Sequence, residues 1–127
     1  MTLVLVLDTS FLVSFFLQAD ENHLKAVEIF EAHRTDEMMI TDTILFETLS
    51  VLNKKGGMAL AKEAYEKLAS NSKMLFVYID EEERKETVSD FLSQKGRLSV
   101  ADVSVVRACK RTLSRALCFD KAVLKEI

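Results

Sequence analysis

Leu3-Val4-Leu5-Val6-Leu7-Asp8-Thr9-Ser10 is the stretch of sequence that decides the fold. Its first five residues are leucine and valine without a polar side chain between them, which is typical of a strand buried on both faces of a parallel sheet. The polar triplet that follows ends this strand, and Thr9 or Ser10 can begin a helix that runs to about Gln18. A buried strand that passes directly into a helix indicates an α/β protein.

The same alternation of strand and helix continues along the chain. Three further short strands are predicted, at Met38–Ile40, Met74–Ile79 and Ala116–Phe119. Helices are predicted over residues 23–33, 42–55, 58–69, 80–94 and 99–112, and from residue 120 to the end. Strands that alternate with helices form a parallel sheet covered by helices on both sides. We therefore expect a single α/β domain over residues 1–127.

The composition fits one cytoplasmic domain that is large enough to fold without a stabilising crosslink. Hydrophobic residues make up 49% of the 127 positions, which is enough for a core, and a charged fraction of 29% argues against overall disorder. The two cysteines, Cys109 and Cys118, lack the short spacing of a metal motif, so we expect reduced thiols. The apolar N-terminus is interrupted by Asp8 and lacks a basic leading segment, so we expect neither a signal peptide nor a membrane span.

The net charge of −3 conceals an uneven distribution of charge. Residues 1–94 carry 9 Lys and Arg against 17 Asp and Glu, whereas residues 95–127 carry 8 against 3. A basic C-terminal third on an acidic protein suits an anionic substrate bound at one site, although two solvated helix faces explain it as well. The pattern does not suit a protein that coats nucleic acid.

Four acidic residues stand where an α/β fold binds its ligands. Asp8 and Asp120 each follow a predicted strand directly, and Asp102 lies in the first turn of a predicted helix. In an open parallel sheet such positions meet beyond the carboxyl ends of the strands. Glu47, the fourth acid, is embedded in the apolar helical stretch Ile44–Leu49. Clustered carboxylates without a paired histidine or cysteine favour Mg²⁺ or Mn²⁺ over zinc.

Each of these acids also has a purely structural interpretation. Asp8 and Asp120 can cap the helices that follow them, and Ser99 with Asp102 has the spacing of a capping box. Glu47 can point to solvent on a polar stripe that it shares with Thr48. Separate caps have no reason to converge on one edge of one sheet, however, so the four acids together favour a metal site.

Four short motifs occur in an informative order along the chain. Leu7-Asp8-Thr9-Ser10 resembles an opening "DTS" segment, and Glu47 follows within an apolar helix. Leu98-Ser99-Val100-Ala101-Asp102 resembles an "LSxxD" element, and Cys118-Phe119-Asp120-Lys121 resembles "TFDxxF". Together these motifs resemble the PIN-domain family, and most closely its VapC-type toxin ribonucleases, over nearly the whole chain. Each motif is weak alone, but four in the right order are specific.

The resemblance implies a fold, an activity and a set of partners. The fold is a PIN-like three-layer sandwich, with a central parallel sheet of four to five strands. The activity is that of an endoribonuclease dependent on Mg²⁺ or Mn²⁺, which serves as the toxin of a type II toxin–antitoxin pair in the cytoplasm. The partners are an RNA substrate, an antitoxin protein whose C-terminal segment covers the acids, and a second copy of the chain in a homodimer.

The resemblance also assigns roles to individual residues. The acids expected to bind metal and act in catalysis are Asp8, Glu47, Asp102 and Asp120, with Thr9, Ser10 and Ser99 in support. The chain departs from the family pattern at Cys118, where a hydroxyl residue is usual, and at Val103, where a small residue is common. It also ends at Ile127, where family members often continue to a fifth strand, so that edge is expected to be short or missing.

Basic and apolar side chains around these motifs suggest contacts with partners. The residues expected to hold the RNA backbone, with solvated surface charge as the alternative, are Lys54, Lys55, Arg107, Lys110, Arg111 and Arg115. The segment Phe11–Leu17 is more apolar than one buried face requires. We therefore expect it either to form a dimer or antitoxin surface or to lie in the core.

Three other functions compete with that of a toxin nuclease. A PIN-domain nuclease that processes RNA without being a toxin would carry the same acids. A PIN-fold module that binds RNA or protein without cutting would not need to bind metal. A phosphatase of the haloacid-dehalogenase type also places an aspartate after its first strand, but it requires a second aspartate two residues later, and Ser10 stands there.

Overall fold

The computed structural model describes residues 4–112 and 115–117, and of Thr112 and Arg115–Leu117 it describes the backbone alone. The described strands are β1 (Val4–Leu7), β2 (Glu37–Thr41), β3 (Met74–Val77) and β4 (Arg115–Leu117). The described helices are α1 (Thr9–Phe16), α2 (His23–Ala32), α3 (Asp42–Gly56), α4 (Met58–Ser70), α5 (Glu81–Ser93) and α6 (Val100–Thr112). The predicted alternation of strands and helices is confirmed over this part of the chain. The helix predicted from residue 120 lies outside it.

The four strands form one parallel sheet in the order β3-β2-β1-β4. β1 lies inside the sheet, where Leu5 is paired with Met38 of β2 and with Arg115 of β4. Leu5, Val6 and Leu7 are fully buried, as the unbroken apolar run predicts for a strand covered on both faces. Because all strands are parallel, their carboxyl ends lie at one edge of the sheet.

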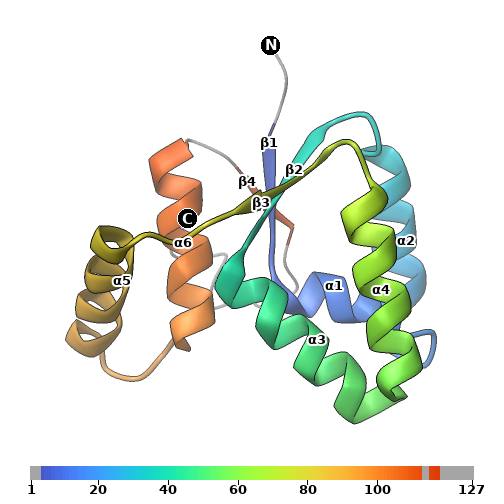
Figure 1. Ribbon diagram of the computed structural model, residues 1–127, viewed down its shortest axis with the longest axis horizontal. Coiled ribbons are helices and arrows are strands. Elements are labelled where there is room, and N and C mark those ends of the chain that lie inside the picture. Colours follow the sequence, from blue (N-terminus) through green and yellow to red (C-terminus); the bar gives the residue numbers. More distant parts are fainter. Residues whose placement is uncertain (1–3, 113–114, 118–127) are drawn as a thin grey trace.

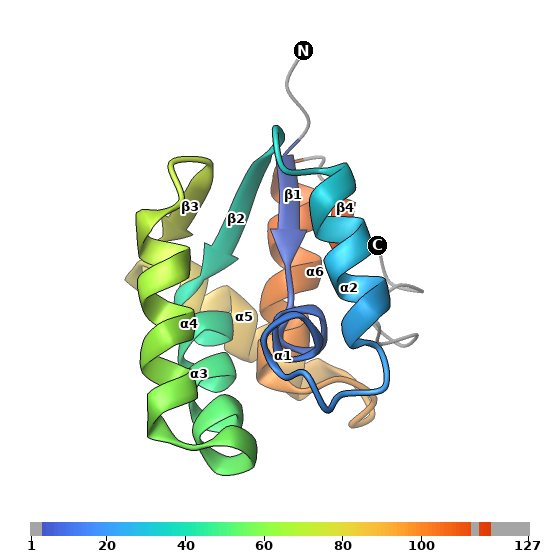
Figure 2. The ribbon, with the colours of Figure 1, turned by 90° about the vertical axis from the view of Figure 1, so that its right-hand side faces the viewer.

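Helices cover both faces of the sheet. Figure 1 shows α5 and α6 on one side of the strands and α2 and α4 on the other, which confirms the predicted three-layer arrangement. α1 and α3 continue directly from the carboxyl ends of β1 and β2, and in Figure 2 both begin at the same edge of the sheet. This is the edge where the sequence predicts the acidic site. No helix in the described residues has the length and apolar character needed to cross a bilayer.

The structure revises several predicted boundaries, among them the end of β3 and the start of β4. β3 ends at Val77 rather than at Ile79, and its Leu75 and Phe76 are 42% and 41% exposed. β3 is an edge strand and pairs with a neighbour on one side only. The length of its apolar run therefore overestimates the length of the strand. β4 begins at Arg115, one residue before its predicted start, and Phe119 lies outside the described residues.

The apolar segment Phe11–Leu17 lies mainly in the core. Phe11, Leu12 and Val13 are buried, and Phe15 and Phe16 pack against the same hydrophobic cluster. The ring of Phe15 lies 4.6 Å from that of Phe30 in α2, measured between centroids. Of the two expectations for this segment, the structure therefore supports burial, and it does not offer a broad docking surface here.

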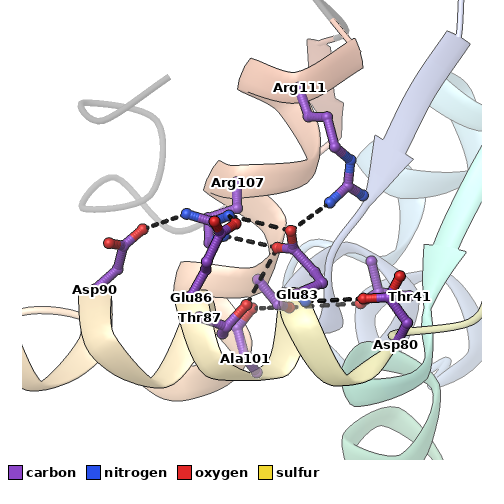
Figure 3. Close-up of polar contacts among 10 residues, drawn as sticks. Thr41, Asp80, Glu83, Glu86, Thr87, Asp90, Ala101, Arg107 and Arg111 are labelled. Carbon is purple, nitrogen blue, oxygen red and sulfur yellow. Dashed lines mark hydrogen bonds and ion pairs between the residues drawn. The ribbon is translucent and has the colours of Figure 1, made fainter.

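α5 is attached to α6 largely by charged side chains. Thr87 is its one buried residue, and Figure 3 shows acidic residues of α5 gathered around Arg107 of α6. The guanidinium of Arg107 donates to Glu83 (2.6 Å from Nε to Oε2), to Asp90 (2.6 Å) and to Glu86 (2.5 Å). Glu83 also pairs with Arg111 at 2.8 Å.

These ion pairs change the pKa values of their members. The hydrogen bond from Arg107 holds the pKa of Glu83 below its usual 4.5, although partial burial opposes the shift. The hydrogen bond to Glu83 in turn raises the pKa of Arg107, so this side chain stays charged at every accessible pH. Arg107 therefore serves as a permanent cationic anchor for α5.

Removal of this anchor should destabilise the protein. Breaking a fully buried ion pair costs roughly 3–5 kcal/mol, and Arg107 is 23% exposed, so we expect Arg107→Met to lower the free energy of unfolding by about 2 kcal/mol. Arg84→Met is the matched control, because Arg84 forms only an exposed pair with Glu81 at 3.9 Å. Its cost should stay below about 0.5 kcal/mol. Urea unfolding measures both, and equal losses would contradict the anchor role.

The same cluster should make stability depend on pH. Because the pKa of Glu83 is lowered in the folded state, its ionised form contributes stability that is fully present above about pH 4.5. That stability is lost as the pH falls from this value through the lowered pKa. We expect Glu83→Gln to be less stable than the unsubstituted protein near pH 7, with a smaller difference near pH 3. Thermal unfolding across this range measures it, and Glu81→Gln, at an exposed position, is the control.

Candidate functional site

A cavity of about 470 Å³ lies beside the carboxyl end of β1. The residues that line it are Asp8, Thr9, Ser10, Val13, Ser14, Asp20, Asn22, Glu47, Val51, Lys55, Ser99 and Asp102. They come from α1, from the turn between α1 and α2, from α3, and from the beginning of α6. Three of the four predicted acids thus share one cavity, and the fourth, Asp120, lies outside the described residues.

Asp8 is the most deeply placed of the three acids, with 1% of its surface exposed. Its Oδ1 accepts a hydrogen bond from the Ser10 hydroxyl at 2.7 Å and one from the backbone N–H of Phe11 at 3.2 Å. Asp8 is therefore the N-cap of α1, as the structural interpretation of this residue predicts. The cap fixes the carboxylate at the end of β1, so capping and a place in the cavity are compatible.

Glu47 enters the cavity from α3. The hydroxyl of Thr9 donates to its Oε2 at 2.8 Å, which joins the first turn of α1 to the second turn of α3. Glu47 is half-buried, whereas Thr48 is fully buried. The proposed polar stripe shared by these two residues is therefore wrong, since Thr48 faces the core while Glu47 faces the cavity.

Asp102 reaches the cavity from the first turn of α6. The hydroxyl of Ser99 accepts from the Asp102 N–H at 3.0 Å, and the Asp102 Oδ2 accepts from the Ser99 N–H at 3.1 Å. This is the reciprocal capping box that the sequence spacing predicts. Ser99 thus holds Asp102 at the start of the helix, where it lines the cavity.

The three carboxylates are held in a similar way. Each one accepts a hydrogen bond on a carboxylate oxygen from a hydroxyl or a backbone N–H. Hydrogen bonds of this kind fix the orientation of a carboxylate, as outer partners do for metal ligands. The predicted supporting residues, Thr9, Ser10 and Ser99, supply these donors. Three acids that the sequence singles out thus line one cavity, and residues predicted to support them donate to their carboxylates.

The potential ligand atoms that line the cavity are of the kind that binds a hard divalent cation. The described lining residues offer carboxylate, hydroxyl and amide oxygens and no histidine or cysteine, which is the ligand type of Mg²⁺ or Mn²⁺. Within the described residues, however, no three acids, histidines or cysteines lie close enough together to hold a metal ion as they stand.

Asp20 is an acid of the cavity that the sequence did not single out. Its Oδ2 accepts from the Ser14 hydroxyl at 2.7 Å and from the Asn22 N–H at 2.9 Å. The hydrogen bond from Ser14 lowers the pKa of Asp20, with smaller contributions from Asn22, Lys55 and His23, so its carboxylate is ionised at neutral pH. In the sequence, Asp20-Glu21-Asn22 is only a polar break between helices, and nothing in it signals a cavity wall.

The predicted RNA-binding residues separate into two groups. Lys55 lines the acidic cavity, whereas the adjacent Lys54 is exposed and does not. Lys110 and Arg111 line a different cavity of about 730 Å³ between α5 and α6, together with Arg107. Because Arg107 is bound by three acids of α5, its placement argues against the predicted contact with RNA. The side chain of Arg115 lies outside the described residues.

Cys109 lies behind the acidic site, in the core of α6. It is buried and forms no disulfide with a described residue, and the other cysteine, Cys118, lies outside the described residues. Burial raises its pKa to about 11, and the nearby charge of Asp8 contributes to the same shift. The thiol therefore stays protonated at neutral pH.

Comparison with known proteins gives a family and a fold. The model of the PIN domain family matches residues 5–127 of the chain. Among solved structures, the crystal structure of Mycobacterium tuberculosis VapC20, a toxin that cleaves the sarcin–ricin loop, superposes with a TM-score of 0.85 at 19% sequence identity. The match covers 95% of this chain and 93% of that one. No curated protein sequence matches the chain.

The hydroxyl that orients Glu47 gives a test of the site that does not depend on catalysis. Thr9→Val keeps the shape of the side chain but removes the donor to Glu47, and loss of such an outer partner typically weakens metal binding about 10- to 100-fold. We expect calorimetry with Mn²⁺ to show this loss. Thr43→Val, in α3 but outside the cavity, is the matched control and should bind Mn²⁺ normally. Equal affinity of both variants would contradict the role of Thr9.

Proposed function

The chain belongs to the PIN domain family, and we propose that it is an endoribonuclease that requires Mg²⁺ or Mn²⁺ and acts as the toxin of a type II toxin–antitoxin pair. One observation carries the proposal: acids from three separate segments line a single cavity at the carboxyl end of β1. Ligands of open α/β sheets bind at this position. The solved toxin VapC20 has the same fold over nearly the full length of both chains.

The charge of the cavity supports a requirement for a cation. Four carboxyl groups line it, from Asp8, Asp20, Glu47 and Asp102, against the single ammonium group of Lys55. A phosphodiester anion is repelled by such a wall unless positive charge is added. Oxygen ligands of this type select a hard divalent ion.

We assign the metal to Asp8, Glu47 and Asp102, with Asp120 as the fourth acid. When bound, the ion lowers the pKa of a water molecule and offsets the charge of the phosphate. The chain's own residues supply the orientation. Asp8 is fixed by its cap, Glu47 by the Thr9 hydroxyl, and Asp102 by its capping box with Ser99.

The proposed partners follow from the same charges. An antitoxin that inserts a basic side chain among the carboxylates would neutralise the site and exclude the substrate. We also propose that the chain forms a homodimer and acts on RNA in the cytoplasm. Phe11–Leu17 is not the dimer surface in this proposal, because its side chains lie mainly in the core.

A PIN-fold module that binds RNA without cutting it is the second candidate. It is favoured by one observation, namely that the described acids do not come close enough together to hold a metal ion as they stand. Titration with Mn²⁺ separates the two functions, because a nuclease of the proposed type must bind the ion and a scaffold need not. A nuclease that processes RNA without being a toxin shares the acids and differs in lacking an antitoxin partner.

Cleavage of RNA tests the proposal directly. We expect the protein to cleave single-stranded RNA in the presence of Mn²⁺ and to stop when the metal is chelated. Asp8→Ala and Asp102→Asn should each lower the rate by at least about 100-fold, because each removes a carboxylate from the metal. Asp36→Asn is the control, since Asp36 pairs with His33 outside the cavity. Undiminished cleavage by both site variants would reject the site.

A further inference from the structure

The turn between α1 and α2 forms a fixed wall of the acidic cavity. The Ser14 hydroxyl and the Asn22 N–H both donate to the Asp20 carboxylate, at 2.7 and 2.9 Å. A third contact joins the Nδ1 of His23 to the carbonyl oxygen of Ser14 at 2.9 Å. Ser14 is buried in α1, so these contacts tie the turn to the core. The side chains on this wall are therefore held in place before any ligand binds.

Asn22 presents an unused donor on this wall. It stands at the N-cap position of α2, but its side chain makes no capping hydrogen bond. No other described residue bonds its side-chain amide, although its backbone N–H and C=O are both engaged. Asn22 lines the cavity and can donate from its amide to a ligand there.

Lys55 faces the same cavity from the last turn of α3. It is the one cation among the described residues that line the cavity, and no described acid lies within 4.0 Å of its ammonium group. Glu47, Val51 and Lys55 follow one another at intervals of four residues, so they lie along one face of α3. Eight residues of helix separate Glu47 from Lys55 by about 12 Å along the helix axis.

We propose that Lys55 and Asn22 form a subsite for a phosphate of single-stranded RNA that is not the phosphate cleaved at the acids. This inference rests on the proposed nuclease function. The cleaved phosphate must lie beside Asp8, Glu47 and Asp102, and Lys55 enters the cavity about two helical turns beyond Glu47, so its position suits a neighbouring phosphate. A strand that enters the cavity at the acids and leaves over α3 brings a neighbouring phosphate to the ammonium and amide donors. Contact with that phosphate fixes the register of the RNA.

Equilibrium binding tests this subsite in a protein that does not cut. The probe is a fluorescein-labelled single-stranded RNA oligonucleotide of mixed sequence, titrated with protein that carries Asp102→Asn. In that background we expect Lys55→Ala to weaken binding about tenfold, because a charge-assisted contact with phosphate is lost. It should also lower the slope of log affinity against log salt by about 0.7. Lys73→Ala, with the same charge change at an exposed position before β3 and outside the cavity, should leave both unchanged.

Neutral linkages in the RNA identify the contacted phosphate. In the same Asp102→Asn background, methylphosphonates are placed at one linkage at a time. At one linkage outside the cleavage position, the protein with Lys55 and the protein with Lys55→Ala should bind equally. Asn22→Ala should weaken binding of the unmodified RNA about threefold, and neutralising that same linkage should remove the difference. Lys55→Arg should keep most of the affinity that Lys55→Ala loses.

The outcomes that overturn the subsite are distinct from failure of the nuclease function. Equal binding by the Lys73→Ala and Lys55→Ala variants would overturn it, and so would an effect of Lys55→Ala that no single neutral linkage removes. Cleavage by the unsubstituted protein with loss in Asp8→Ala would still support the nuclease in that case. No RNA binding by any form of the protein would overturn both.

Discussion

Parallel pairing of β1 with a strand on each side is the constraint on which the rest of the structure depends. β1 is buried between β2 and β4, and its three core residues are fully covered. Because every strand runs in the same direction, the chain leaves β1 at the edge where α3 and α6 also begin. Asp8 is the first residue beyond the strand, so its carboxylate is fixed at that edge by the backbone itself.

The site uses ordinary helix caps to orient its acids. The cap at Asp8 and the capping box at Asp102 satisfy backbone N–H groups that would otherwise lack partners. The same bonds hold one oxygen of each carboxylate in the cavity wall. The structural and functional interpretations of these residues, which compete in the sequence, therefore describe one arrangement. Glu47 differs from them, because it is oriented by the Thr9 hydroxyl across two helices rather than by its own helix.

Charge is divided between two neighbouring regions with different tasks. Around the acidic cavity, carboxylates exceed cations, and Lys55 stands alone as the ammonium group among the described lining residues. Between α5 and α6, Arg107 and Arg111 are paired with acids and fasten a helix that buries little apolar surface. The basic C-terminal third of the sequence thus contributes to stability through Arg107. A count of charges along the sequence does not distinguish a cation that anchors a helix from one that faces a ligand.

The sequence by itself determined the α/β alternation, the buried first strand, and three of the acids that share the cavity. These follow from local signals: an unbroken apolar run, a polar residue after a strand, and the spacing of a capping box. Only the tertiary structure decided which side chains face the same space. It brought Asp20 and Lys55 to the cavity from a turn and from the end of a helix. It also placed most of Phe11–Leu17 in the core and paired Arg107 of α6 with acids of α5. Those outcomes depend on contacts between segments far apart in the chain, which no local pattern encodes.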